Sequence, residues 1–182
     1  MISDIDETVV LSVARQALEA RVARLPPPDV ACTGPLALRC GAFVSIHCGE
    51  ALRGCLGRLT ADSPLGRTLV HLGGALADCD PRFSPVTPEE LPRLYIEISL
   101  LTSERPVATI DDIEVGRHGL IVEHGGSRGV LLPQVATQHG WDRRVFVEQT
   151  CMKAGLAPDA WTSGARVHVF EAHVFSENGW PT

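Results

Sequence analysis

The stretch GAFVSIHCGEALRGCLG, residues 41–57, decides the fold class, because it predicts two antiparallel strands joined by a short turn. In its first half the side chains alternate between two faces, with Val44, Ile46 and Cys48 on one and Phe43, Ser45 and His47 on the other. Gly49 and Glu50 form the predicted turn. A hairpin of this kind favours a mainly antiparallel sheet.

The second half of the hairpin contains the motif LRGCLG, residues 52–57, in which two glycines flank Cys55. Glycine allows close approaches that other residues prevent, so another group can come near the main chain here. Strict alternation along the strand would place Leu52 and Leu56 on one face and Arg53 with Cys55 on the other. We therefore predict a thiol and a cation on the same surface.

The rest of the chain interleaves helices and strands without a regular βαβ repeat, which predicts the α+β class. Helices are predicted over residues 4–25, 64–76 and 142–154, and strands over residues 94–101, 119–124, 129–132 and 167–175. Thr87, Pro88 and Glu90 predict one further helix start. Residues 125–129 fit the G-x-S-x-G pattern, but a strand follows them, so we predict a hairpin turn there instead of a hydrolase nucleophile.

The composition is that of an ordinary globular protein, with 45% hydrophobic and 21% charged residues among 182. A chain of this length forms one domain or two small lobes with a sizeable core. No apolar run approaches the roughly 20 residues of a membrane helix, and the acidic start MISDIDETVV does not resemble a secretory signal. We therefore expect a cytoplasmic protein without a membrane span, in which disulfides do not form.

Cysteine spacing and net charge argue against several functional classes. The six cysteines contain no C-x-x-C pair, which disfavours a zinc ribbon, a thioredoxin-type site and an iron–sulfur cluster. A net charge of −6 disfavours a generalised phosphate-binding surface. The sequence contains no nucleotide-binding loop, dinucleotide fingerprint or H-E-x-x-H motif. We expect neither a metal nor a cofactor in this chain.

Six motifs follow one another in an order that resembles the AMMECR family. They are LRGCLG (52–57), DPRFSPV (80–86), IEISLL (96–101), EVGRHGLIV (114–122), GVLLPQVA (129–136) and GWD (140–142). The resemblance continues through TCMKAGLAPDAW (150–161) and the strand that ends at Phe175, so it covers nearly the whole chain. One departure is Leu56, where many relatives have Ile; an apolar swap of equal size keeps the motif intact.

The resemblance implies an α+β fold of two closely packed lobes, mainly antiparallel sheet with flanking helices, in a single AMMECR domain over residues 1–182. It also implies that the LRGC-containing segment is the family signature. Prokaryotic relatives often occur beside, or fused to, a Memo-type protein and together with a radical S-adenosylmethionine enzyme. That trio is the AmmeMemoRadiSam system, and this chain is similar to its protein A. Radical chemistry would belong to the partner, because this chain has no radical-enzyme cysteine triplet.

Cys55 is the candidate catalytic residue, as a thiolate nucleophile or as an acyl, alkyl or redox acceptor whose pKa is lowered by Arg53 or a histidine. The candidate bases are His47, His71 and His118. We choose His118, which follows Arg117 in a GRHG turn, because loops carry function more often than strand faces do. Non-covalent binding at the motif and a purely structural, inert Cys55 remain open.

Residues in and around the motifs are predicted to bind a substrate or an anion. They are Arg53, Gly54, Gly57, Arg58, Asp80, Arg82 and Arg117. Asp80 and Arg82 could orient a substrate, although Asp-Pro after a leucine-rich helix also ends a helix. A metal site could be built from His47, Cys48 and Cys55, but this spacing matches no familiar site.

Three functions remain open at the level of sequence. The first is an enzyme, or enzyme component, that handles a small molecule or modified group near Cys55 with a Memo-type protein and a radical enzyme. The second is a module whose Arg53, Arg58 and Arg82 bind nucleic acid, a phosphorylated ligand or an acidic partner, although acidity and few aromatics disfavour an RNA-stacking platform. The third is an adaptor whose motif holds the lobes together.

Overall fold

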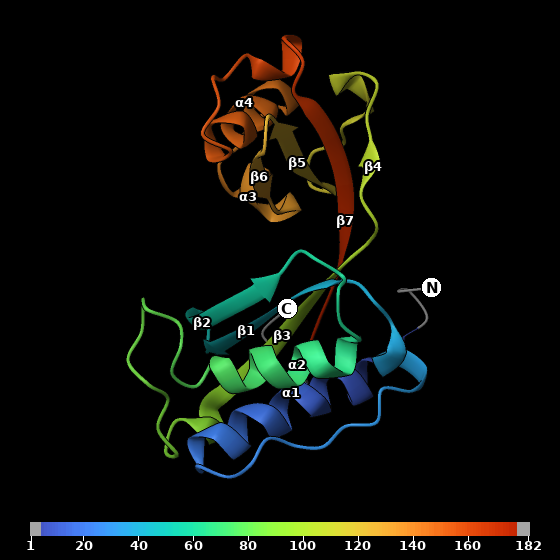
Figure 1. Cartoon of the computed structure of the whole chain (residues 1–182). Coiled ribbons are helices and arrows are strands. Elements are labelled where there is room, and N and C mark those ends of the chain that lie inside the picture. Colours follow the sequence, from blue (N-terminus) through green and yellow to red (C-terminus); the bar gives the residue numbers. More distant parts are fainter. Residues whose placement is uncertain (1–4, 178–182) are drawn as a thin grey trace. The chain divides into compact units, whose positions relative to one another are not determined.

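The computed structural model describes residues 5–177, and the chain divides into two compact units (Figure 1). Unit 1 comprises residues 1–101 and 173–182, and unit 2 comprises residues 102–172. The last strand, β7 (Arg166–Ser176), begins in unit 2 and ends in unit 1. Both units combine antiparallel strands with helices, so the predicted α+β class is confirmed.

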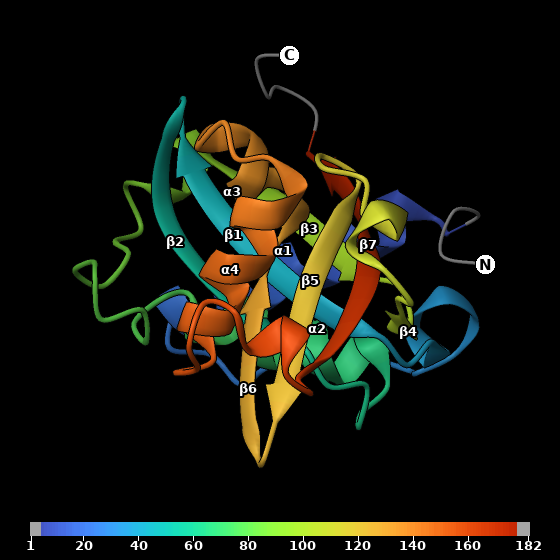
Figure 2. The same cartoon turned by 90° about the horizontal axis from the view of Figure 1, so that it is seen from above.

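Two helices of unit 1, α1 (Glu7–Val22) and α2 (Leu65–Ala75), cover one face of its strands (Figures 1 and 2). The side chain of Asp6 caps the first turn of α1. The helices approach each other at Gly73, where a Cβ atom would lie 2.5 Å from the carbonyl oxygen of Ala14. This close approach explains a glycine that would otherwise weaken the helix. Both helices were predicted, with longer ends than they have.

The strands of unit 1 have the order β2-β1-β3-β7. They are β1 (Gly41–Cys48), β2 (Ala51–Arg58), β3 (Leu94–Leu101) and the end of β7. β1 pairs antiparallel with both β2 and β3, which confirms the predicted hairpin. The face toward the helices is apolar: Val44, Ile46 and Ile98 are fully buried in one core with residues of α1 and α2. β2 is the edge strand of this unit.

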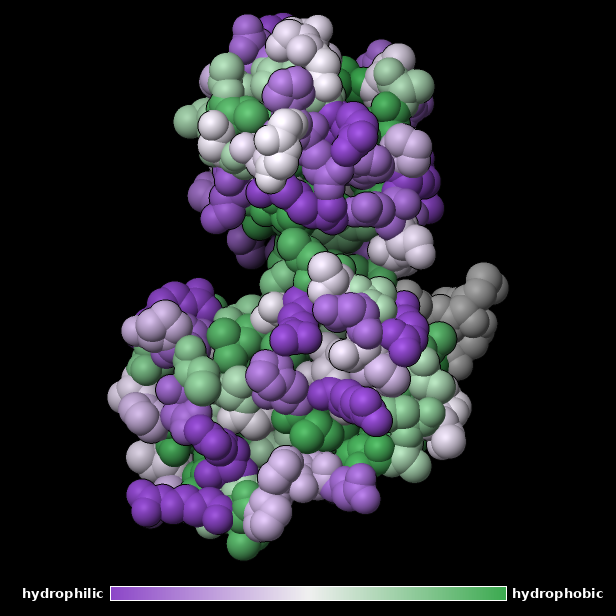
Figure 3. Space-filling model, viewed as in Figure 1, coloured by the Kyte–Doolittle hydropathy of each residue, from purple (hydrophilic) through white to green (hydrophobic). Residues whose placement is uncertain are grey.

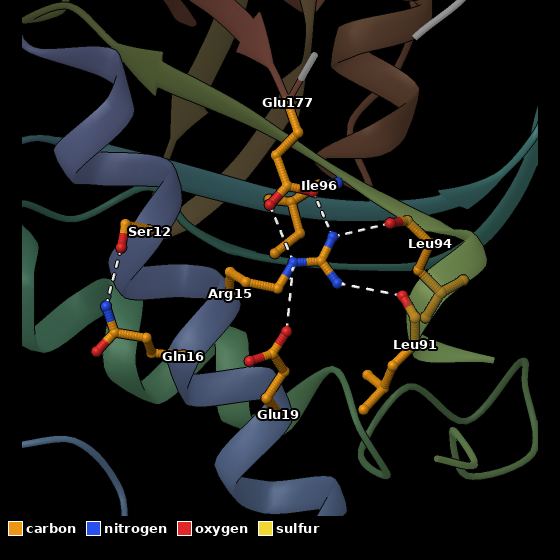
Figure 4. A network of polar contacts seen from close by, with 8 residues as sticks. All are labelled: Ser12, Arg15, Gln16, Glu19, Leu91, Leu94, Ile96 and Glu177. Atoms are coloured by element: carbon orange, nitrogen blue, oxygen red, sulfur yellow. Dashed lines mark hydrogen bonds and ion pairs between the residues drawn. The ribbon is translucent and has the colours of Figure 1, made fainter. Parts of the chain in front are cut away.

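The end of β7 is tied to α1 and β3 by a charged network (Figure 4). The Arg15 guanidinium forms an ion pair with the Glu177 carboxylate, in which Nε donates to Oε1 at 2.9 Å. Glu177 also accepts the Ile96 N–H at 2.9 Å, and the Arg15 Nη2 donates to the Leu94 carbonyl at 2.8 Å. Because both side chains are mostly buried, this network fixes the end of the strand within unit 1.

Unit 2 has the strand order β4-β7-β5-β6, with all pairs antiparallel. Its elements besides β7 are β4 (Arg105–Pro106), β5 (His118–His124), β6 (Ser127–Leu131), α3 (Pro133–Gln138) and α4 (Arg143–Lys153). Leu120, Phe146 and Val169 lie in its core and are fully buried. The predicted turn between β5 and β6 is confirmed, and its Gly125 and Gly126 adopt positive φ angles of 55° and 89°.

Two details differ from the sequence-based expectation. The helix start at Thr87 leads only to a 3-10 turn, Leu91–Arg93, because β3 begins at the next residue. The Glu90 side chain still accepts the Thr87 N–H at 2.8 Å, as in a capping box. The short helix α3 was not predicted, because six residues after a strand are too few to show a helical period.

Further 3-10 turns span Gly34–Ala37, Ile110–Asp112 and Ala160–Thr162. Among residues 5–177, none of the helices has the length and apolar character required to cross a bilayer.

Candidate functional site

The hairpin that carries the LRGCLG motif contains a β-bulge. Gly54 lies opposite Ile46, but Leu52 lies opposite His47, so Arg53 is an extra residue in β2. The bulge reverses the alternation before Gly54. The prediction that Leu52 and Leu56 share a face is therefore wrong. Leu56 packs against the core of unit 1, whereas Leu52 lies opposite His47, on the other face of the sheet, and is exposed.

The two glycines of the motif provide room for neighbouring side chains. A Cβ atom on Gly57 would lie 2.1 Å from the Cδ1 atom of Phe43 on the paired strand, so the aromatic ring occupies the place of a side chain. A Cβ atom on Gly54 would lie 3.2 Å from Ile46 and 3.3 Å from Leu76. The close approach expected from the sequence is thus confirmed at Gly57, and the group that approaches is Phe43.

The main chain of Cys55 is held by the DPRF motif, residues 80–83. The Cys55 N–H donates to the Asp80 carboxylate at 2.9 Å, and the Arg82 Nη2 donates to the Cys55 carbonyl at 3.3 Å. Arg82 in turn binds Asp80 through Nε at 2.9 Å and through Nη2 at 2.7 Å. Both main-chain groups of Cys55 on the open side of the edge strand are therefore satisfied. We call these contacts the Asp80–Arg82 clamp.

The clamp is charged. The Asp80 side chain is 4% exposed, and its hydrogen bonds from Arg82, assisted by the Cys55 N–H, hold its pKa far below the usual range. Asp80 is therefore ionised at neutral pH, and the Asp80 contact raises the pKa of Arg82. Asp80 is thus a structural anion that joins two motifs, and it is not poised as a general acid or base.

Arg53, the cation inside the LRGC motif, is engaged elsewhere. Its Nε donates to Glu90 Oε1 at 2.9 Å, and its Nη2 donates to the Ser84 carbonyl at 3.0 Å. Only 15% of its side chain is exposed. The Phe83 ring lies near both arginines, 5.8 Å from the Arg53 Cζ and 5.3 Å from the Arg82 Cζ. The cation that contacts Cys55 is therefore Arg82, through the main chain.

The Cys55 side chain belongs to the sheet face that the helices do not cover. The register places Cys55 opposite Ser45, and Ser45 opposite Glu97, so these three side chains form one row across β2, β1 and β3. Cys55 is partly exposed. A thiol on a fixed strand and within reach of solvent can act as a nucleophile or as a contact to a ligand.

The other cysteines differ in exposure and in acidity. Cys40 and Cys151 are buried, and burial raises the pKa of both thiols. Cys48 and Cys79 are exposed, but a hydrogen bond to Asp78 raises the pKa of the Cys79 thiol. Cys48 is therefore the strongest competitor of Cys55 for a thiol reagent.

His118 and Arg117 both belong to unit 2. The His118 ring is 3% exposed; its Nδ1 accepts the Glu114 N–H at 3.0 Å, and its Nε2 lies 3.2 Å from the Arg105 Nη2. Burial, followed by the positive charge of Arg105, lowers the pKa of His118, so the ring is neutral at pH 7. Arg117 forms ion pairs with Glu114 and Glu171. The role of His118 as a base for Cys55 stays a prediction.

The other candidate residues lie at separate places in unit 1. His47 is on β1, His71 is exposed on α2, and Arg58 is exposed at the end of β2. Within residues 5–177, no three His, Cys, Asp or Glu side chains gather as metal ligands would. His47 and Cys48 are consecutive in a strand and point to opposite faces, so they cannot act with Cys55 as a single set of ligands.

The structure joins two of the motifs found in the sequence, LRGCLG and DPRF, at the main chain of Cys55. Sequence reasoning named Arg53, Cys55, Asp80 and Arg82 but did not predict that Asp80 meets Cys55. It missed Glu90 and Phe43. The signals for both were present, because Glu90 was part of a capping pattern and Phe43 lies on the strand predicted to pair with Gly57.

Comparison with known proteins gives one family. A model of the AMMECR1 family matches residues 11–175. A protein of Methanosarcina acetivorans is 38% identical over 187 residues, covering 97% of this chain and 94% of the relative. A protein of Thermofilum pendens is 41% identical over 193 residues, covering 93% of this chain and 88% of the relative.

A solved structure is also similar. The crystal structure of the uncharacterized protein PH0010 from Pyrococcus horikoshii matches with a TM-score of 0.80 and 36% sequence identity. The match covers 93% of this chain and 90% of that one.

Proposed function

Because this chain belongs to the AMMECR1 family, we propose that it is a component of the AmmeMemoRadiSam system, working with a Memo-type protein and a radical S-adenosylmethionine enzyme. Its part is to handle a small molecule or modified group at the LRGCLG segment. The observation that carries the proposal is the Asp80–Arg82 clamp, which fixes the main chain of a partly exposed cysteine.

The clamp suits a site because it orders Cys55 from both sides. β1 pairs with β2 on one side, and Asp80 and Arg82 bind the main chain of Cys55 on the other. A group held in this way loses little entropy when it engages a ligand.

In the acceptor role, the Cys55 sulfur forms a bond to the carbon of the transferred group. The leaving group departs with the bonding electron pair, and the thiol proton passes to a base. In the non-covalent role, the same sulfur and the neighbouring Ser45 contact the ligand without a bond being made. In both roles the partner enzyme carries out the radical steps, and this chain holds the group for them.

An anion- or RNA-binding module is the alternative, and the ion pairs weigh against it. Arg53 is paired with Glu90, and Arg82 with Asp80, so two of the three cations expected to hold an anion are already compensated. Only Arg58 of that set is exposed with no compensating partner among the described residues. A plain adaptor is favoured by one observation, the packing of Phe43 into Gly57, which needs no ligand.

The proposal is tested by incubating the full chain with a metabolite extract, the Memo-type protein and the radical enzyme of one organism. Intact mass and peptide mapping then report any adduct. The expected result is an adduct on Cys55 that is absent in Cys55→Ser and kept in the matched control Cys48→Ser. A pull-down of the Memo-type protein tests the adaptor role. If Cys55→Ser still binds the Memo-type protein and no variant carries an adduct or a ligand, the proposed site at Cys55 is contradicted and an adaptor is supported.

A further inference from the structure

A cavity of about 650 Å³ lies in unit 1 between α1, α2 and the connector that follows α1. The connector runs back along the helix pair because α1 ends sharply (Figure 1). Arg24 has a positive φ of 57°, and the Leu25 N–H donates to the Ala20 carbonyl at 2.8 Å, which is the pattern of a Schellman motif. The described residues that line the cavity do not include Cys55, Asp80 or Arg82, so the cavity is separate from the Asp80–Arg82 clamp.

The walls of the cavity are largely aliphatic. They include Leu25, Pro27, Pro28, Val30 and Val70. No Phe, Tyr or Trp occurs among the described lining residues, so a stacked nucleobase would find no platform here. In Figure 3, hydrophobic surface is exposed between hydrophilic side chains over α1 and α2. An occupant would therefore bury an aliphatic body.

Positive charge lies along the α2 side of the cavity. Arg67 and His71 are one helical turn apart on the exposed face of α2, and both line the cavity. Among residues 5–177, neither side chain forms a hydrogen bond or an ion pair with another residue. The other arginine of the lining, Arg21, is already paired with Asp78 at 2.8 Å. Arg67 is thus the arginine of this cavity without an ion pair among the described residues, and Asp29, on the connector, is the carboxylate of the lining.

We propose that this cavity binds a small amphipathic anion, with an aliphatic body against the prolines and Leu25 and a carboxylate or phosphate at Arg67. The volume is within the range of roughly 300–1,000 Å³ that is typical of small-molecule sites. Such sites are mostly apolar and have a few polar groups that fix orientation, as Arg67 and His71 do here. The guanidinium can bind either head group through two parallel hydrogen bonds.

Octyl compounds with different head groups test this proposal by isothermal titration. Octanoate and octyl phosphate should bind, whereas octanol and octylammonium, which have the same chain, should bind at least about tenfold more weakly. Arg67→Glu should weaken octanoate binding about tenfold, and His71→Ala should weaken it less. The matched control Arg39→Glu makes the same charge change at an exposed arginine outside the cavity and should bind normally. Equal binding of octanoate and octylammonium would overturn the proposal.

A second readout does not depend on any variant. Cys32 lines the cavity and is partly buried, whereas Cys48 is exposed and lies outside it. Saturating octanoate should slow alkylation of Cys32 several-fold and leave the rate at Cys48 unchanged. If both rates stay the same while octanoate binds, the anion occupies another place and the proposal fails.

Discussion

The backbone N–H of Cys55 donates to the carboxylate of Asp80 at 2.9 Å, across 25 residues of sequence. This contact joins the family signature to the loop after α2, and Arg82 closes it by donating to the Cys55 carbonyl. An edge strand normally exposes such main-chain groups to other chains. The loop therefore protects the edge and fixes Cys55 at the same time.

Removing Asp80 should cost more stability than removing Arg82. Asp80→Ala leaves the Cys55 N–H without its acceptor and Arg82 without its anion, which should lower the free energy of unfolding by about 2–4 kcal/mol. Arg82 is 55% exposed, so Arg82→Ala should cost only about 1 kcal/mol. Urea unfolding of the two variants measures both. An equal or larger loss in Arg82→Ala would contradict the central position of Asp80.

Acid should remove the contribution of Asp80. Its pKa in the folded state lies far below the value of about 3.9 expected when unfolded, so its stabilisation is complete above that pH and is lost as the pH falls below it. The difference in unfolding free energy between the wild type and Asp80→Asn should therefore be larger at pH 6 than at pH 3. Asp62→Asn, at an exposed carboxylate, is the control. A difference that does not shrink at pH 3 would refute this assignment.

Because Gly57 and Phe43 are in contact, the effects of substituting them on the free energy of unfolding should not add. Gly57→Ala places a methyl group 2.1 Å from the ring and should destabilise the protein by about 1–3 kcal/mol. Gly54→Ala meets its neighbours at 3.2 Å and should cost less. In a Phe43→Leu background the Gly57→Ala penalty should fall by at least half. Chemical unfolding of the four proteins of the double-mutant cycle decides this, and equal penalties in both backgrounds would disprove it.

The two arginines near the motif should affect the Cys55 thiol differently. Arg53 is held by Glu90, so Arg53→Ala and Glu90→Ala should show a coupling of about 1–2 kcal/mol in unfolding. The rate of Cys55 alkylation should change more in Arg82→Ala than in Arg53→Ala, because Arg82 holds the main chain of Cys55, whereas Arg53 is held by Glu90. A larger rate effect from Arg53 would favour the original expectation from the sequence.

Much of the fold could be predicted from local patterns. The hairpin at residues 41–57, the helices α1, α2 and α4, and the turn at Gly125 follow from periodicity, caps and glycines. The faces of β2 could not be predicted, because alternation assumes no inserted residue and the bulge at Arg53 shifts the register by one. The helix α3 is too short to show a period.

The candidate site was predicted residue by residue but not as an arrangement. The sequence marked Arg53, Cys55, Asp80 and Arg82, and the structure places all four in and around the same edge strand. Which group each residue binds depends on long-range contacts, because Glu90 and Asp80 are both distant in sequence from Arg53 and Cys55. Local patterns do not contain that information.

Alkylation of the folded full chain by iodoacetamide at neutral pH, in a Cys48→Ser and Cys79→Ser background, tests the account most directly. Peptide mapping then follows the four remaining thiols. The account predicts that Cys55 is modified well before Cys32, Cys40 and Cys151, because Cys40 and Cys151 are buried and the Cys32 thiol donates to the Val30 carbonyl, whereas the partly exposed Cys55 is held only by its main chain. If Cys55 is labelled only after denaturation, together with the buried Cys40 and Cys151, it is a structural residue and the proposed site is wrong.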